Sequence, residues 1–290
     1  MSVFTSFAIA GVGNIGAYLA EELLKLEASG KVKEVVLLTR SGSTNANTDK
    51  LVQKGAKLAT IDYASKDSLT AALSGVDVVI STLSLPAFEA QDAVAVAAKA
   101  AGVRLFMPSE FGGRSDEVTE GVLFAKKRFH ARLQEIGLPY ILVYTGGFPD
   151  LIFNSRLNLD IKSGKVSIGG DGNSLVSFTS RPDIARFLAH VLTTLTPDQL
   201  NNKILRIEGE RIPFSEVFKQ YEEKTGTKLE ITYRSIADLE AAVKANPADF
   251  VSVLHLGWAQ GDAVVGKKED VSNGLFPGWN PKKVIEVLAP

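Results

Sequence analysis

The 290-residue chain contains no cysteine, and this absence excludes disulfide bonds, thiolate catalysis and cysteine-ligated metal sites. A lack of cysteine is compatible with a reducing compartment without establishing one. The chain has only three histidines, His130, His190 and His255, and their spacing is not that of metal ligands. We therefore expect no metal centre.

An excess of charge of one sign is also lacking. Lysine and arginine number 32 against 33 aspartate and glutamate, which gives a formal net charge of −1. Nothing in this balance indicates a nucleic acid or an anionic membrane as partner. No basic segment followed by an apolar signal core stands at the N-terminus, and no apolar run is long enough to span a bilayer. The expected location is the cytoplasm, and the oligomeric state stays open.

Two familiar catalytic patterns are absent. No tyrosine is followed four positions later by lysine, as in ordinary short-chain dehydrogenases, because Tyr63 and Tyr221 precede Lys66 and Lys224 by three. No Gly-x-Ser-x-Gly nucleophile elbow occurs either. Any catalysis must therefore rest on other groups.

A strong local pattern is present near the start of the chain. Apolar residues 3–10 indicate a strand, three glycines follow, and a helical stripe then begins with Ile15 and Leu19. In this arrangement one glycine allows a tight turn, one admits a pyrophosphate and one lets the helix pack closely. The helix N-terminus adds partial positive charge. The alternative is a glycine turn without ligand. The expected cofactor-binding residues here are Gly11, Gly13, Asn14, Ile15 and Gly16.

Strands and helices then alternate as far as residue 144, which predicts an α/β fold with a doubly wound parallel sheet of the Rossmann type. The near-continuous apolar character of these strands is typical of a sheet covered on both faces. The expected strands are 33–39, 57–61, 76–81, 103–107 and 140–144, and the expected helices are 66–73, 91–101 and 119–136.

The end of the second strand indicates which dinucleotide is bound. An acidic residue at this point would accept hydrogen bonds from the free ribose hydroxyl of NAD. The sequence has Arg40 and Ser41 instead, and a guanidinium suits a 2′-phosphate. We therefore expect NADP(H), with a solvated surface arginine as the alternative. Asp62, after the third strand, either lies near the adenine or caps the next helix.

Later strand ends supply further candidates, because ligands bind at the carboxyl edge of open α/β sheets. The fourth strand runs into a segment that ends in Leu85 and Pro86, and the sixth into a turn that carries Phe148. Phe148 either covers a nicotinamide ring or seals the core. The remaining cofactor candidates at this edge are Thr82, Leu83, Ser84, Pro108 and Ser109.

Lys126 interrupts an apolar stripe on the predicted helix 119–136. It lies four positions after Val122 and three before Phe129, so helical spacing places it on the apolar face. Buried lysine is rare. From the pattern alone we favour a Lys126 side chain whose aliphatic part lies along the apolar surface while its ammonium reaches water. For His130, one turn later, we favour a packing or surface role.

Beyond about residue 150 the alternation breaks, and a smaller substrate-binding region is expected. We assign 1–150 and about 178–207 to the NADP-binding domain, and about 151–177 and 208–290 to the substrate region. Phe148, Phe153 and one or both of Trp258 and Trp279 are expected to line the substrate pocket, the tryptophans with ordinary core packing as the alternative. The later elements are read as segments 153–159, a hairpin-like 166–172, 176–180, a helix to 195, a strand 203–207 and helices 213–225 and 236–245.

Several runs resemble the NmrA-like and isoflavone reductase-like family of atypical short-chain dehydrogenases. The most specific is Pro-Ser-Glu-Phe-Gly at 108–112, and the glycine turn, Leu38–Arg40, Gly75–Ser81 and 137–140 follow the family's order. One departure is Ala10, which stands where plant reductases have their first glycine. The family includes reductases of phenolic metabolites and NADP-sensing regulators.

The resemblance implies roles for particular residues. The family's catalytic lysine lies fourteen positions before the aromatic residue of a later strand, and counting back from Tyr140 reaches Lys126. This coincidence reverses the preference for a solvated lysine. Lys126 is then both catalytic and cofactor-binding. The family's aromatic residue near the nicotinamide corresponds to Phe148, and Gln91 is a cofactor contact. The substrate residues implied or expected are Glu110, Phe111, Phe148 and Phe153.

Three functions compete at this stage. The first is an NADPH-dependent reductase of a small, aromatic or phenolic molecule, with Lys126 as general acid/base. The second is a regulator that senses NADP without chemistry, and the third is a scaffold for protein partners. An ionisable group on a buried face favours the reductase, since a sensor does not need one.

Overall fold

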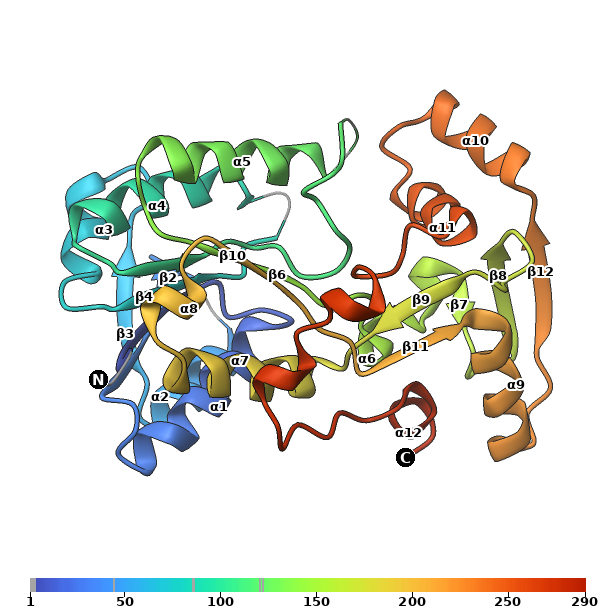
Figure 1. Cartoon of the computed structure of the whole chain (residues 1–290), viewed down its shortest axis with the longest axis horizontal. Coiled ribbons are helices and arrows are strands. Elements are labelled where there is room, and N and C mark those ends of the chain that lie inside the picture. Colours follow the sequence, from blue (N-terminus) through green and yellow to red (C-terminus); the bar gives the residue numbers. More distant parts are fainter. Residues whose placement is uncertain (1–3, 44, 85–86, 120, 122) are drawn as a thin grey trace. The chain divides into compact units, whose positions relative to one another are not determined.

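Figure 1 shows the computed structural model, which describes residues 4–43, 45–84, 87–119, 121 and 123–290. The chain divides into two compact units. The first comprises residues up to 110, 125–143 and 184–205, and the second comprises 111–124, 144–183 and 206–290. A few residues used in the predictions lie outside the described ones: Val3, Leu85, Pro86 and Val122.

The first unit is built on a five-stranded sheet in the order β3-β2-β1-β4-β5. Every neighbouring pair is parallel, and the central β1 aligns Phe7 with Val35 on one side and Val78 on the other. All residues of β1 and β4 are buried, as expected of strands covered on both faces. The doubly wound sheet is confirmed. Its strands are β1 Ser6–Ala10, β2 Glu34–Arg40, β3 Lys57–Ile61, β4 Val78–Ser81 and β5 Leu105–Met107.

Helices cover both faces of this sheet, with α4 and α5 on one side and α1 and α7 on the other (Figure 1). The predicted stripe of α1 is buried from Ile15 to Leu24. In α4 small residues such as Ala95 and Ala98 are fully buried, which lets the helix lie close to the sheet. The helices of this part are α1 Gly16–Ala28, α2 Ala46–Gln53, α3 Lys66–Ala72, α4 Ala90–Ala100, α5 Phe124–Glu135, α7 Arg181–Thr194 and α8 Pro197–Leu200.

The helix predicted over 119–136 begins later than expected. α5 starts at Phe124, because Gly121 takes a φ of +78°, outside the helical region. Phe129 and Leu133 of the predicted stripe are buried, and Ile136 falls just after the helix. Lys126 therefore lies in the first turn of α5 and not in its middle.

Two further strands continue beyond the five-stranded sheet. A parallel bridge joins Phe106 to Tyr140, and β6 Ile141–Tyr144 pairs with β10 Lys203–Arg206. The strands predicted at 140–144 and 203–207 are thus present to within a residue or so.

The second unit contains two small sheets, β11-β9 and β12-β8-β7. The hairpin-like reading of 166–172 was wrong: β8 pairs antiparallel with β7 before it and parallel with the distant β12. The segment 153–159 holds a short 3-10 helix. The elements are α6 Pro149–Ile152, β7 Leu159–Asp160, β8 Lys165–Gly169, β9 Leu175–Phe178, β11 Glu210–Pro213, α9 Phe214–Thr225, β12 Glu230–Arg234, α10 Ile236–Ala245, α11 Phe250–Gln260 and α12 Val284–Leu288.

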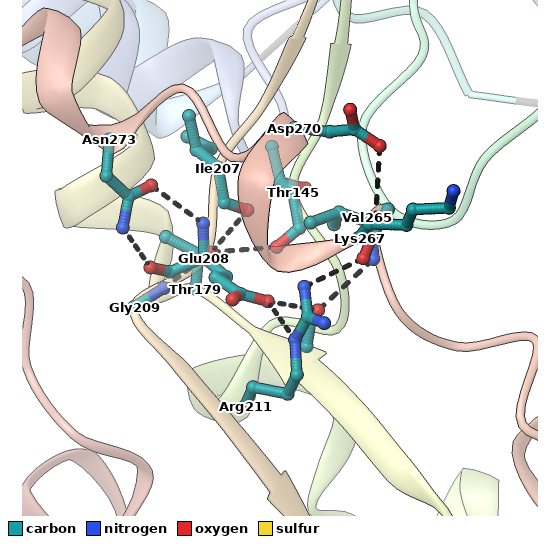
Figure 2. A network of polar contacts seen from close by, with 12 residues as sticks. Thr145, Thr179, Ile207, Glu208, Gly209, Arg211, Val265, Lys267, Asp270 and Asn273 are labelled. Atoms are coloured by element: carbon teal, nitrogen blue, oxygen red, sulfur yellow. Dashed lines mark hydrogen bonds and ion pairs between the residues drawn. The ribbon is translucent and has the colours of Figure 1, made fainter.

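A polar network ties the chain after α11 to β9 and β11 (Figure 2). Arg211 forms an ion pair with Glu208 at 2.8 Å, and its guanidinium also donates to the carbonyl of Gly266 at 2.9 Å. The same Glu208 carboxylate accepts from the Ser177 hydroxyl, and Asn273 bonds the Glu208 main chain in both directions. This network holds the irregular tail on the sheet of the second unit.

Candidate functional site

The glycine turn between β1 and α1 is tight for reasons internal to the protein. Gly11 has a φ of +99°, and a Cβ on Gly16 would lie 2.1 Å from the Gly11 carbonyl oxygen. The Thr82 hydroxyl, at the end of β4, donates to that same carbonyl. Gly11 and Gly16 are therefore required by backbone conformation and by packing respectively.

The middle glycine differs, because a Cβ on Gly13 would meet nothing within 4 Å. Gly13 and Asn14 are exposed, the N-cap residue Ile15 makes no side-chain hydrogen bond to α1, and the first turn of α1 carries no acidic residue. Open space in front of a helix N-terminus suits a pyrophosphate. The residues predicted here therefore fit a dinucleotide.

Asn45 supports this turn and was missed by the sequence analysis. Its side-chain amide donates to the Val12 carbonyl at 2.7 Å, while its oxygen accepts from the Asn47 amide and caps α2. An asparagine just before a helical run was the available signal. It joins the loop after β2 to the glycine turn.

Arg40 ends β2 with an exposed side chain, and Ser41 after it is exposed as well. Arg40 has no ion-pair partner among the residues that the structure describes. The charge of Arg40 acts on Tyr63: burial raises the pKa of this phenol, and the positive charge of Arg40 lowers it. An unneutralised guanidinium at the ribose end of the sheet fits a 2′-phosphate.

The second alternative for Asp62 was wrong. The side chain that caps α3 is Ser65, which accepts from the Ser68 amide. Asp62 instead accepts from the Ala64 amide and closes a turn. The N-cap position of α3 is three residues after Asp62, which leaves the aspartate too far away to cap the helix.

The carboxyl ends of β4 and β5 bring the other candidates of the first unit to one edge. Thr82 is half-buried, Leu83 buried and Ser84 exposed. Gln91, on α4, is fully buried, and its oxygen accepts from the Ser109 amide at 2.7 Å. Its side-chain nitrogen is buried and has no hydrogen-bond partner among the residues that the structure describes. An orphaned amide donor beside the Pro108–Ser109 turn is the kind of group that a bound ligand satisfies.

Lys126 faces the same turn from α5. Its Nζ donates to the main-chain carbonyl of Glu110, and its side chain is half-buried. Burial lowers the pKa of the Lys126 ammonium, and the negative charge of Glu110 opposes this by raising it. A lysine with a lowered pKa at the carboxyl edge of the sheet has the character of a proton-transfer group.

The carboxylate of Glu110 is turned toward His130. Glu110 Oε1 lies 2.7 Å from His130 Nε2, and the two side chains are 1% and 10% exposed. The packing or surface role favoured for His130 was therefore incomplete, because its ring binds a buried carboxylate. Spacing on α5 was the signal: His130 follows Lys126 by four residues, so both lie on one helix face.

The remaining candidates belong to the second unit. Phe111 has a φ of +39° and is 9% exposed, next to Gly112, which exchanges hydrogen bonds with Thr145. Phe148 is half-buried at the start of α6. The Phe153 ring lies 5.9 Å from that of Phe214, against the core of this unit.

The two tryptophans have structural partners. Trp258 is buried in the same core, with its ring 4.8 Å from that of Phe214. Trp279 donates its indole N–H to the Asp183 carbonyl at 3.1 Å. Core packing, the alternative given for both residues, describes Trp258.

Comparison with known proteins identifies the family. The model of the NmrA-like family matches residues 7–254, which include the glycine turn and Lys126. The chain belongs to the NmrA-like family.

Several members and structures are similar to this NmrA-like chain. It is 32% identical to isoflavone reductase homolog A622 of Nicotiana glauca over 88% of this chain and 86% of the relative. It is 30% identical to phenylcoumaran benzylic ether reductase POP1 of Populus trichocarpa over 88% and 87%. The solved structure of AtPrR2 with NADP+ and (+)pinoresinol matches 99% of both chains at a TM-score of 0.83 and 23% identity. That of leucoanthocyanidin reductase with NADPH from Vitis vinifera matches 97% of both at 0.81 and 23%.

The described part of this NmrA-like chain contains no group of three or more histidine, cysteine or acidic side chains arranged to hold a metal. Among the same residues, no helix combines the length and apolar character needed to cross a bilayer.

Proposed function

We propose that this NmrA-like protein is an NADPH-dependent reductase of a small aromatic or phenolic metabolite, with Lys126 as its general acid/base. The observation that carries the proposal is the Lys126 ammonium, which is bound to the main chain of Glu110 at the carboxyl edge of the sheet and has a lowered pKa. The reaction class is supported by relatives that are named as reductases and by similar structures that contain NADP+ or NADPH.

The first unit offers the binding groups for the cofactor. The open space at Gly13 and the N-terminus of α1 would accept the pyrophosphate, and Arg40 would bind the 2′-phosphate. The side-chain nitrogen of Gln91 and the residues Thr82–Ser84, Pro108 and Ser109, at the carboxyl edge of the sheet, would hold the nicotinamide end. Phe148, Phe111, Phe153 and Glu110 stay proposed contacts of nicotinamide or substrate.

Bound NADPH supplies a hydride. As a general acid, the Lys126 ammonium gives a proton to a substrate oxygen when the hydride is transferred. As a general base, the neutral amine takes a proton from a substrate phenol. The lowered pKa makes both forms of the side chain accessible nearer neutral pH than in a solvated lysine. The carbonyl of Glu110 keeps the Nζ at a defined place while the proton moves.

A sensor of NADP without catalysis is the second candidate. The observation that favours it is the hydrogen bond from Lys126 to a main-chain carbonyl, which a purely structural lysine also makes. Both candidates bind the cofactor, so turnover distinguishes them.

The test is NADPH oxidation across a panel of phenylpropanoids, flavonoids, quinones and ketones, with cofactor binding measured in parallel by calorimetry. A reductase consumes NADPH in step with formation of a reduced product. Tight NADP binding without turnover of any panel member, in either direction, contradicts the reductase and favours the sensor.

A further inference from the structure

Three groups at the β5 exit are linked through one residue. Glu110 uses its main-chain carbonyl to accept from Lys126 Nζ and its carboxylate to contact His130 Nε2 at 2.7 Å. Lys126 and His130 approach it from adjacent turns of α5. Two residues of α5 thus bind the same glutamate: Lys126 binds its backbone and His130 binds its side chain.

The turn that carries Glu110 is held from the other side as well. The Ser109 amide donates to the buried oxygen of Gln91 at 2.7 Å, and the Glu110 amide donates to the Pro108 carbonyl at 2.7 Å. The backbone carbonyl offered to Lys126 is therefore fixed. The carboxylate end of the side chain is contacted by His130, which favours one orientation of the side-chain torsions.

A buried carboxylate needs partners, because desolvation of its charge is expensive. The Glu110 side chain is 1% exposed, and its charge already acts on Lys126. The Lys126 ammonium, which feels the charge of Glu110 and already binds its main chain, is a donor to which this carboxylate can turn when His130 is removed. A direct ion pair would hold the ammonium protonated and oppose proton transfer.

We propose that His130 is a positioning residue that holds the Glu110 carboxylate, so that Lys126 is directed to the carbonyl of Glu110 and stays able to exchange its proton. The inference rests on the proposed role of Lys126. The other charged residues are Asp92 and Lys99 on α4, and Lys127, Arg128, Arg132 and Glu135 on α5. Arg132 pairs with Asp92 at 2.8 Å and with Glu135 at 3.0 Å, and Lys99 donates to the Gly137 carbonyl.

Two substitutions then act in opposite directions on the pH at which Lys126 titrates. His130→Leu releases the carboxylate to pair with Lys126, and the titration moves up by about one pH unit. Glu110→Gln removes the negative charge at constant shape, and the titration moves down by about one unit. In the double variant no carboxylate is left to pair, so the upward shift disappears. His130→Gln keeps a donor and leaves the titration nearer its starting value.

The measurement is competitive acetylation of the full-length protein across about pH 6 to pH 11, read at Lys126 by peptide mass spectrometry. It needs neither substrate nor turnover. His190→Leu is the matched control for loss of a histidine. His190 lies on α7, and the charge that acts on it is that of Lys31. Circular dichroism checks folding, and Glu110→Gln keeps the test decisive if His130→Leu does not fold.

Unchanged titration of Lys126 in folded Glu110→Gln, or a downward shift in folded His130→Leu, would overturn the proposal. Where a substrate is known, His130→Leu should lower kcat about tenfold at neutral pH with KM within about threefold. Opposite titration shifts in a protein that reduces no substrate uphold the positioning and contradict the proposed function, so the two failures are distinguishable.

Discussion

Lys126 Nζ donates its hydrogen bond to the main-chain carbonyl of Glu110, and this relationship joins α5 to the exit of β5. A carbonyl cannot take up the proton and carries no net charge. It orients the ammonium while leaving the balance between burial and the Glu110 charge to set its pKa. The Glu110 carbonyl thus holds the Lys126 ammonium in place without neutralising its charge.

Replacing Lys126 with alanine should abolish chemistry and spare cofactor binding. We expect kcat on an identified substrate to fall by about 10²–10⁴-fold, the usual worth of a positioned acid/base, while NADPH affinity changes little. Stopped-flow NADPH oxidation and calorimetry measure the two effects. Lys127→Ala, the neighbouring lysine on α5, is the matched control. A Lys126→Ala enzyme with near-normal turnover would show that the proton comes from another group, with Tyr144 and Ser109 next in line.

The lowered pKa of Lys126 predicts how stability depends on pH. Between the lowered folded pKa and the ordinary lysine value of about 10.4, the unfolded chain binds more protons at this site than the folded one. The contribution of this lysine therefore becomes more favourable to folding as pH rises through that window. Urea unfolding of the parent and Lys126→Met at several pH values checks this. The unfolding free energy of the parent should rise relative to that of the variant as pH increases. A difference between the two that stays constant, or that shifts in favour of the variant, contradicts a lowered pKa of Lys126.

Arg40 should determine the preference for NADP(H). Arg40→Glu places a carboxylate where the 2′-phosphate is proposed to bind, and it should lower NADPH affinity about tenfold or more. NADH affinity should be kept or improved, since a carboxylate accepts from the ribose hydroxyls. Calorimetric titration of both cofactors with both proteins measures the change, and Lys33→Glu before β2 controls for net charge. Equal affinity of the parent for NADP and NAD would rule out this role of Arg40.

Gly13 and Gly16 should respond differently to alanine. At Gly16 the new Cβ would lie 2.1 Å from the Gly11 oxygen, so we expect a loss of about 1–3 kcal/mol in unfolding free energy. At Gly13 the Cβ would meet no atom of the described residues within 4 Å apart from its chain neighbours, so stability should stay within about 0.5 kcal/mol while NADPH affinity falls about tenfold. Urea unfolding and cofactor titration are compared for both variants. Undiminished NADPH binding by Gly13→Ala would place the pyrophosphate elsewhere.

The ion pair of Glu208 and Arg211 should be important for the second unit (Figure 2). Both side chains are largely buried, at 13% and 12% exposed, so Arg211→Met leaves an uncompensated carboxylate. We expect a loss of about 3 kcal/mol or more in unfolding free energy. The double variant Glu208→Gln/Arg211→Met should lose less than Arg211→Met alone, because the unpaired charge is gone. Thermal and urea unfolding measure this, and a double variant worse than the single one argues against charge burial as the cause.

The sequence by itself determined the parallel sheet and most of its helices, because hydrophobic periodicity and glycine placement are local signals. β1 and α1 follow from such patterns, and Lys126 stood out as a cation on an apolar helix face. The second unit was read less well, since β8 pairs with β12 more than sixty residues away and no local pattern reports such a partner. The start of α5 was missed because Gly121 overrides the helical pattern around it.

The contacts around the candidate site were decided only by the tertiary structure. Asn45 binds Val12 across 33 positions, and His130 binds Glu110 across 20, so neither pairing is visible as a spacing. Which side chain meets which depends on the meeting of strand ends at one sheet edge, and that is a property of the folded sheet. The sequence shows which residue types are available for chemistry. Which residues they contact is decided only when distant segments pack together.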